Sequence, residues 1–338
     1  MTGAALQVDD LTIGFVERRR TLVAVRNLSF AIAPGEALAI VGESGCGKSL
    51  TALSLLGLLP KPGRVLGGSI RVEGEEIVGR TGEALRRLRG DRIAMIFQEP
   101  MTALNPVLTV GKQIVEAVRA HRAVSRAEAR ERAVALLERV RIPDAGRRLD
   151  EFPHRLSGGM RQRVMIAMAL ACDPAVLVAD EPTTALDVTI QAQILDLIDD
   201  LRRERGMAVA LITHDLGVVA RHAERTLVMY AGAKVEERPT AELFADPRHP
   251  YTRGLIAARP GGRLSARRRL TEIPGRVPAL DEMPAGCAFA PRCDLADDAC
   301  RAAPPPLEAA GAHGLVACLK ARSVERAPAP RAKVAVHV

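Results

Sequence analysis

A glycine-rich loop at residues 42–49 constrains the fold of this chain more than any other feature of its sequence. It follows the apolar run 37–41 and leads into a helix-like segment, 50–56. Glycines let backbone N–H groups curl around phosphate oxygens, the lysine meets the terminal phosphates of a nucleotide, and the next hydroxyl can ligate Mg²⁺. The alternative is a glycine-rich turn that carries Lys and Ser without a ligand. The predicted nucleotide-binding residues are Gly42, Glu43, Ser44, Gly45, Cys46, Gly47, Lys48, Ser49 and Leu50.

The composition indicates a globular chain of about two domains. Of its 338 residues, 48% are apolar and only 2% are aromatic, with no Trp, which argues against a base-stacking nucleic-acid surface. The net charge of +8 comes largely from arginine, which clusters at 18–20, 147–148 and 267–269. These clusters favour an anionic membrane face or simply keep the protein soluble.

The sequence predicts a soluble, cytoplasmic chain. No uninterrupted apolar stretch reaches the roughly eighteen residues of a spanning helix, and the N-terminus lacks the basic and apolar pattern of a secretory signal. Four of the six cysteines crowd into positions 287–318. In a reducing compartment such crowding indicates metal ligation in preference to disulfide bonds.

The order of predicted elements indicates an α/β fold. Short strands are expected at 11–15, 23–25, 28–32 and 69–72, and a helical region at 110–142, where Ser125 and Glu128 form a capping-box pattern. A second series follows, with helices at 157–171 and 190–201 and buried strands at 175–179 and 208–212. This alternation predicts a parallel sheet flanked by helices.

Asp180 and Glu181 follow the apolar strand 175–179 directly. Beside a phosphate-binding loop, both carboxylates should lie at the carboxyl edge of the sheet, next to the nucleotide. One would hold Mg²⁺ through water, and the other would orient or deprotonate the attacking water. Alone, the pair could be a polar end to a strand, but with the loop it predicts a nucleotide hydrolase.

At this point the chain resembles the ATP-binding-cassette (ABC) ATPases over residues 7–258. The run 156–163 stands where that family has its signature motif, with Ser157, Gly158 and Gly159 at a predicted helix start. Residues 185–187 are similar to the family's D-loop. The resemblance assigns Gln98 to the Q-loop, His214 to the switch histidine and Phe15 to the aromatic that stacks on adenine. Without these roles, Gln98 would be a polar residue at a strand end, His214 a histidine with ordinary hydrogen-bond partners at a strand end, and Phe15 a core residue.

The resemblance implies a cassette at 1–261, with an antiparallel β subdomain and a helical subdomain at about 100–160. Catalysis would use Lys48, Gln98, Glu181 and His214, with ATP and with Mg²⁺ held by Ser49, Gln98 and Asp180. In the family, the signature of one subunit closes on the ATP of another. Since this chain has one cassette, a second ATPase subunit is implied, expected to be non-identical.

The runs 156–164, 101–106, 249–252, 274–278 and 286–293 are similar to the branch that imports oligopeptides, dipeptides and nickel. That branch carries an extension, here 262–320, and residues 321–338 are expected to be a disordered tail. In the extension, no two cysteines have the CxxC spacing of a zinc ribbon. A [4Fe–4S] cluster, zinc and free thiols all stay open. The candidate ligands are Cys287, Cys293, Cys300 and Cys318.

The resemblance implies an ATP-hydrolysing subunit of a bacterial ABC importer for di- or oligopeptides or related solutes. Such a subunit lies on the cytoplasmic face of the inner membrane as a peripheral protein. It binds two membrane permeases and works indirectly with a solute-binding protein. The alternative is a soluble cassette ATPase of nucleic-acid repair or translation. A non-catalytic nucleotide sensor is disfavoured because Glu181 is present.

Overall fold

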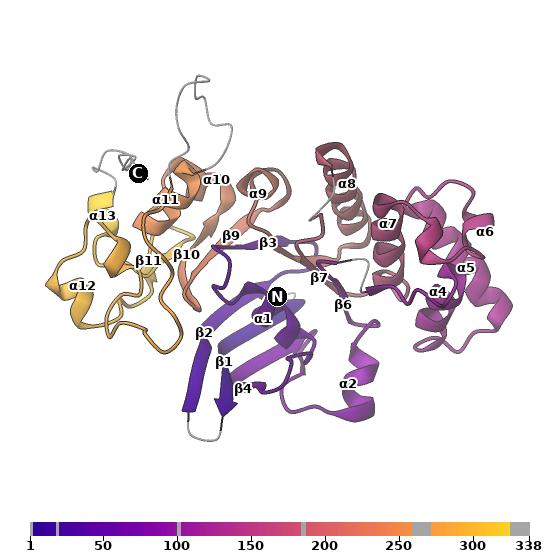
Figure 1. Cartoon of the computed structure of the whole chain (residues 1–338), viewed down its shortest axis with the longest axis horizontal. Helices are drawn as coiled ribbons and strands as arrows, with labels where there is room; N and C mark the ends of the chain where they lie inside the picture. Colours follow the sequence, from indigo (N-terminus) through magenta and orange to yellow (C-terminus); the bar gives the residue numbers. More distant parts are fainter. Residues whose placement is uncertain (1–2, 18–19, 100–102, 184–186, 259–271, 325–338) are drawn as a thin grey trace, which may run out of the picture.

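The computed structural model describes residues 3–17, 20–99, 103–183, 187–258 and 272–324. Within these ranges the strands form two sheets, which lie one above the other in Figure 1. A group of helices lies at one end of the molecule and the C-terminal segment at the other. The architecture is the mixed α/β fold that the sequence predicts. None of the described helices is both long and apolar enough to cross a lipid bilayer.

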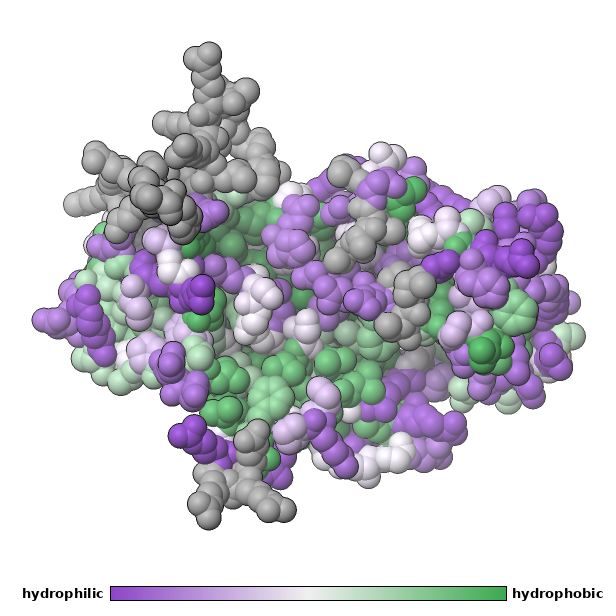
Figure 2. Space-filling view, in the orientation of Figure 1, coloured by the Kyte–Doolittle hydropathy of each residue, from purple (hydrophilic) through white to green (hydrophobic). Residues whose placement is uncertain are grey.

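The smaller sheet is antiparallel, with the described strands in the order β2-β1-β4-β5. Its strands are β1 (Leu6–Glu17), β2 (Arg20–Ile32), β4 (Gly63–Val72) and β5 (Glu75–Glu76). One face packs on the larger sheet, where Leu6, Val8 and Ile70 share a buried cluster with Leu38 and Ile40. This sheet is the predicted antiparallel β subdomain, and Figure 2 shows hydrophobic residues on its visible side.

The larger sheet has the order β11-β12-β10-β9-β3-β8-β7-β6 among the described strands. Its strands are β3 (Ala37–Val41), β6 (Ile93–Ile96), β7 (Val176–Asp180), β8 (Ala208–Ile212), β9 (Arg225–Tyr230), β10 (Ala233–Pro239), β11 (Glu308–Ala309) and β12 (Leu315–Val316). Neighbours from β9 to β6 are parallel. Every residue of β3 and β8 is buried, which explains their continuous apolar sequences.

Several of the helices begin where a side chain accepts a free backbone N–H group, as at Thr109 before α4, Ser125 before α5 and Asp215 before α9. Ser125 starts α5 through both hydrogen bonds of the predicted capping box with Glu128, and Gly206 ends α8 in a left-handed conformation. The helices are α1 (Lys48–Leu55), α2 (Gly82–Leu88), α4 (Val110–Arg119), α5 (Arg126–Arg139), α6 (Ala145–Arg148), α7 (Gly158–Ala169), α8 (Val188–Arg205), α9 (Leu216–His222), α10 (Thr240–Ala245), α11 (Pro250–Ala257), α12 (Asp298–Ala302) and α13 (Ala321–Val324), with short 3₁₀ turns at η1 (Pro153–Arg155) and η2 (Ala290–Arg292).

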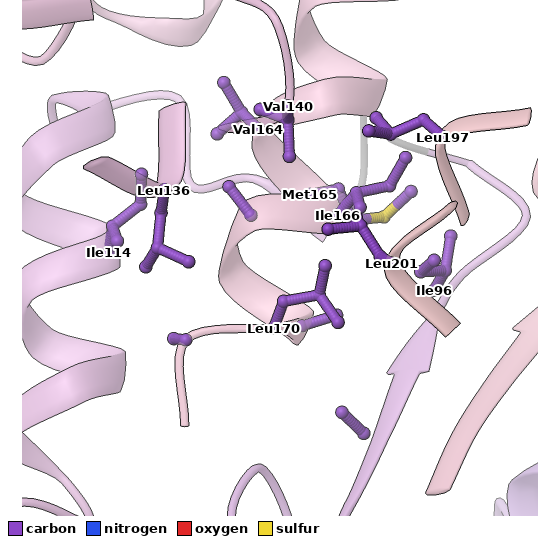
Figure 3. Close-up of a cluster of buried hydrophobic side chains, with 14 of the residues drawn as sticks. Ile96, Ile114, Leu136, Val140, Val164, Met165, Ile166, Leu170, Leu197 and Leu201 are labelled. Atoms are coloured by element: carbon purple, nitrogen blue, oxygen red, sulfur yellow. The ribbon is translucent and has the colours of Figure 1, made fainter. Parts of the chain in front are cut away.

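Helices α4 to α7 form the predicted helical subdomain, and one apolar cluster joins it to the larger sheet. Figure 3 shows Ile114 of α4 and Leu136 of α5 on one side of α7, with Leu197 and Leu201 of α8 on the other. The α7 residues between them are almost entirely buried. Because α7 packs on both sides, it connects the helical subdomain to the strands that carry the acidic pair.

The C-terminal segment packs on the cassette and extends its sheet. Strand β12 pairs with β10, and Phe289 enters a cluster with Tyr230 and Tyr251. The predicted boundary at residue 262 falls outside the described residues, so the domain division stays a prediction. The expectation of a disordered tail from residue 321 is wrong for Ala321–Val324, which forms α13 because backbone bonds run back to residues 318 and 320. Residues 325–338 lie outside the described ranges.

Candidate active site

The phosphate-binding loop joins β3 to α1, as predicted, and is packed between two other strands. Gly42 has a φ of +154°, and a Cβ there would lie 2.3 Å from the Met229 carbonyl oxygen of β9. Gly47 has a φ of +99°, and its Cβ would lie 2.9 Å from Val25 of β2. Only glycine fits both requirements, positive φ and close approach of backbone. Strands β2 and β9 therefore set the shape of the loop.

Lys48 is turned into the loop. Its ammonium donates to the carbonyl oxygens of Gly42 at 2.8 Å and Glu43 at 3.0 Å. Ser44, Gly45 and Ser49 are exposed and form the solvent side of the loop, whereas Cys46 is buried, which raises the pKa of its thiol. The loop thus combines backbone N–H groups, a cation and a hydroxyl, the donor set that a nucleotide triphosphate requires.

Asp180, the last residue of β7, lies beside Ser49. The Ser49 hydroxyl donates to the carboxylate at 3.3 Å, and only 5% of Asp180 is exposed. Burial raises the pKa of Asp180, and the charge of Glu181 raises it further. A hydroxyl and a carboxylate at one point are oxygen ligands of the kind that Mg²⁺ prefers, so these residues fit the predicted magnesium site.

Glu181 stands at the centre of a small polar cluster. One carboxylate oxygen accepts a hydrogen bond from the Gln98 amide at 3.1 Å, and the other lies 3.1 Å from Nδ1 of His214. Gln98 follows β6 and His214 follows β8, so the strand ends on both sides of β7 bring the three side chains together. Glu181 has a φ of +47°, a strained conformation held in part by its N–H bond to Ile212.

The signature residues form a second, separate helix start. Ser157 caps α7 through a 3.3 Å bond from the Met160 N–H, and Ser157 and Gly158 are exposed. Figure 1 shows α7 in the helical group, away from α1 and the phosphate-binding loop. The side chain of Gln162, buried in α7, donates to the carbonyl oxygen of Pro182, the residue after Glu181. The signature helix is thereby connected to the acidic pair.

Comparisons with known proteins agree with this geometry. The family described as ABC transporter matches residues 25–184, and the one described as oligopeptide/dipeptide transporter, C-terminal region, matches residues 235–300. A protein of Brucella abortus (strain 2308) named as a peptide import ATP-binding protein is 53% identical over 326 residues, 93% of this chain and 96% of the relative. The chain belongs to the ABC transporter family. A Sinorhizobium fredii protein named as a peptide ABC transporter ATP-binding protein is 53% identical over 320 residues, 94% of this chain and 96% of the relative.

A solved structure shares the cassette fold. The dimeric ATP-binding cassette MJ0796, in a post-hydrolysis state with ADP and Pi, is 29% identical with a TM-score of 0.62, covering 70% of this chain and 98% of that one. The predictions of an ABC cassette fold and of an ATPase are confirmed by these matches. The alternative, a soluble cassette of repair or translation, is not favoured.

Two predicted features of the ATP site, Phe15 and the D-loop, are not part of the cluster around Glu181. Phe15 lies in β1 and pairs with Leu22 of β2. Further along the same pair of strands, Ile13 pairs with Val25, which approaches the loop at Gly47. The adenine-stacking role of Phe15 stays a prediction. Residues 185 and 186 of the D-loop fall outside the described residues, and Asp187 caps α8 by accepting the Ile190 N–H.

The four clustered cysteines line one small cavity of about 20 Å³, which Lys320 and the buried His249 also border. Burial raises the pKa of Cys287, Cys293 and Cys318, in the last case to about 12. Among the described residues, no group of three or more His, Cys, Asp or Glu side chains is arranged to hold a metal ion. We call this cavity the thiol pocket.

Sequence reasoning missed the residues that join the extension to the loop. The Tyr251 hydroxyl accepts the N–H of Glu43 at 2.8 Å, and Arg292 forms an ion pair with the Glu43 carboxylate at 2.6 Å. Both lie in runs that resemble the importer branch, 249–252 and 286–293, but nothing in their spacing indicates a contact with a loop some two hundred residues earlier. Only the packing of α11 and η2 against β9 reveals it.

A wider cavity of about 1200 Å³ lies at the other edge of the sheet, bordered by Ala175 and Met207 at the N-terminal ends of β7 and β8. Arginines line it, but they are paired with acids, such as Arg122 with Asp91. It is therefore separate from the strand ends that carry the polar cluster around Glu181.

Proposed function

We propose that this ABC ATPase energises the import of peptides or related solutes through two membrane permeases. The observation that carries the proposal is the combination, in one chain, of the polar cluster around Glu181 with an oligopeptide/dipeptide transporter C-terminal region. Relatives whose names refer to peptide import support the solute class. The transported solute is expected to be selected by a separate binding protein and the permeases, since the cassette binds the nucleotide.

Hydrolysis follows from the positions of the side chains. Lys48 and the loop N–H groups would stabilise the charge of the phosphates, and Ser49 and Asp180 would hold Mg²⁺, which neutralises phosphate charge when bound. Glu181 accepts the proton of the attacking water. Gln98 and His214, each bonded to a different oxygen of that carboxylate, fix its orientation, and both are placed to contact the γ-phosphate and the water.

The exposed signature supports a two-cassette assembly. Ser157 and Gly158 offer a capped helix start that faces solvent, and one chain does not bring it onto its own loop. We expect the signature of this chain to complete the ATP site of a second, non-identical ATPase subunit. The signature of that subunit would complete the ATP site of this chain. The solved relative MJ0796 is dimeric, which supports an assembly of two cassettes.

Exposed hydrophobic side chains support a permease contact close to the Q-loop. Val107 is 74% exposed, Phe152 39% and Phe97 38%. The N–H of Val110 donates to the Glu151 carbonyl at 2.9 Å, which brings the Val107 turn beside Phe152. Val107 and Phe152 thus form a small exposed apolar group, and such groups mark interaction sites. Phe97 precedes Gln98, so a permease bound here could sense the catalytic cluster from the cytoplasmic face of the membrane.

The experiment is reconstitution of the chain with its permeases and partner ATPase in liposomes. We expect ATP hydrolysis to rise when a peptide-loaded binding protein is added, and Phe152→Asp to reduce assembly while the isolated chain still binds ATP. As a control, Glu83→Gln, an exposed change in α2, should alter neither. Assembly with two copies of this chain and no second ATPase would overturn the heterodimer, and hydrolysis stimulated by nucleic acid instead would overturn the importer.

We also propose that the thiol pocket ligates a [4Fe–4S] cluster, with zinc as the alternative. Four thiols border one cavity, the number that such a cluster takes. Backbone N–H groups point at the sulfurs of Cys287 and Cys293, and the Lys320 N–H donates to Cys318 at 3.3 Å. Such bonds stabilise thiolates, the form in which cysteine ligates a metal.

The cluster is tested by anaerobic purification. We expect brown protein with broad absorption near ~400 nm from thiolate-ligated iron. Cys293→Ser should bleach the colour. Cys172→Ser, at a buried position between α7 and β7, should not. Colourless protein with one zinc per chain would overturn the cluster but keep the metal site. Four titratable thiols without metal would overturn both.

A further inference from the structure

An ion pair joins the C-terminal segment to the second residue of the phosphate-binding loop. Arg292 of η2 donates from Nη1 to Glu43 Oε2 at 2.6 Å and from Nη2 to Glu43 Oε1 at 3.0 Å. The arginine side chain is only 4% exposed, and that of Glu43 is 29% exposed. This is the two-pronged geometry in which a guanidinium holds a carboxylate most firmly.

Further hydrogen bonds hold the Arg292 guanidinium in place beside the loop. Its Nε donates to the Pro274 carbonyl at 2.8 Å, Nη2 to the Ile273 carbonyl at 3.1 Å, and Nη1 to the Tyr230 hydroxyl at 3.3 Å. The guanidinium carbon lies 5.7 Å from the centre of the Tyr230 ring. A lysine could carry the charge but could not make this set of planar bonds.

Every polar group of Glu43 is engaged. Its N–H donates to the Tyr251 hydroxyl at 2.8 Å, its carbonyl oxygen accepts from Lys48 at 3.0 Å, and its carboxylate is held by Arg292. Tyr251 is fully buried in α11. The first turn of the loop is thus held by two elements of the C-terminal part of the chain, and by the lysine that is to meet the phosphates.

The charge of Glu43 presents a problem that Arg292 resolves. The loop must receive a nucleotide with several negative charges, yet it carries a carboxylate at its second position. Inside a partly buried site, an unpaired carboxylate repels phosphates far more than it would in water. With the guanidinium bonded to both oxygens, this charge is neutralised where it stands.

We propose that Arg292 is a positioning residue for ATP binding: by holding the Glu43 carboxylate in a two-pronged ion pair, it neutralises the charge that would repel the triphosphate. The inference rests on the ATP site proposed above. By this proposal the extension contributes to the affinity for the nucleotide. This contribution does not depend on any group bound in the thiol pocket.

The test measures ATP affinity and turnover of the full-length chain as KM, kcat and the Kd of a fluorescent ATP analogue. Arg292→Met should raise KM and Kd about tenfold, corresponding to the loss of one well-placed charge interaction, with kcat within about threefold. Glu43→Gln alone should bind at least as tightly as the wild type, because the Arg292 guanidinium then keeps its positive charge without a carboxylate that neutralises it. In the double variant, the Gln should restore most of the affinity that Arg292→Met loses.

Controls separate this role from general stability and from the ATP site itself. Arg301→Met changes an exposed arginine of the same segment and should bind as the wild type does. If Arg292 had only a structural role, the double variant would bind ATP no more tightly than Arg292→Met does. That result would overturn the proposal. If Arg292→Met does not fold, weaker binding by Glu43→Gln overturns it equally. A wild-type chain that binds no ATP contradicts the proposed function instead.

Discussion

Replacing Asp180 by Asn should stabilise the nucleotide-free chain while it removes the magnesium site. The carboxylate is 5% exposed, its one bond from the Ser49 hydroxyl is long at 3.3 Å, and Glu181 is the next residue. Burial and the charge of Glu181 therefore raise the pKa of Asp180 above its ordinary value of 3.8. A buried charge that is this weakly compensated opposes folding, and Asn has the same shape without the charge.

The size and sign of the effect follow from that environment. Removing such a functional charge typically stabilises a protein by about 1 kcal/mol, which corresponds to a rise in Tm of about 2 °C for a chain of this size. Because the folded-state pKa is raised, the wild type loses stability relative to the variant as the pH rises through that value. The difference should be present at pH 7 and should vanish below about pH 4, where Asp180 is protonated in both states.

The assay is thermal unfolding of both proteins between pH 4 and 8, with and without Mg²⁺ and ADP. The ligands should stabilise the wild type more than the variant, reversing the order, and ATP turnover of the variant should fall by at least about 100-fold. Glu181→Gln serves as the control for a neighbouring charge that has two hydrogen-bond partners. A variant that is less stable than the wild type at pH 7 would refute the view of Asp180 as a strained, functional charge.

Three further substitutions test other parts of the site and fold. Glu181→Gln should bind ATP normally but hydrolyse it about 100-fold more slowly or worse, because Gln98 and His214 still hold the side chain but no base remains; near-normal turnover would remove Glu181 from that role. Gly42→Ala should lower unfolding free energy by about 2 kcal/mol or more in urea titrations, since its Cβ would meet a β9 carbonyl, whereas Gly67→Ala, with open space around it, should be within about 0.5 kcal/mol of the wild type. Ser125→Ala breaks the capping box of α5 and should lose about 1 kcal/mol; an unchanged urea midpoint would contradict this.

Much of the cassette could be predicted from local sequence. Residues 37–41 and 208–212 are apolar throughout because each strand is covered on both faces, and their predicted bounds match β3 and β8. Ser125 and Glu128 fix the start of α5 through bonds between residues three positions apart. In each case the interactions that decide the structure lie within a few residues, so the pattern is visible in the chain itself.

The catalytic cluster was partly predictable. The loop, the acidic pair, Gln98 and His214 each follow a strand, and parallel strands end at one edge, so their meeting follows from the fold class. That Gln98 and His214 bond to opposite oxygens of Glu181 depends on the exact order β8-β7-β6, which places β7 between the other two. Sequence order alone does not fix which strand is central.

The sequence by itself determined the cassette, its nucleotide loop and its acidic pair, because short-range spacing encodes backbone shape and the chemistry of phosphate binding. Tertiary structure alone decided how the last third of the chain acts on that loop. Arg292 and Glu43 are 249 positions apart, and four cysteines without paired spacing come to border one cavity. Such contacts depend on how α11, η2 and β12 pack against β9 and β10, and packing between distant segments leaves no periodic pattern in either of them.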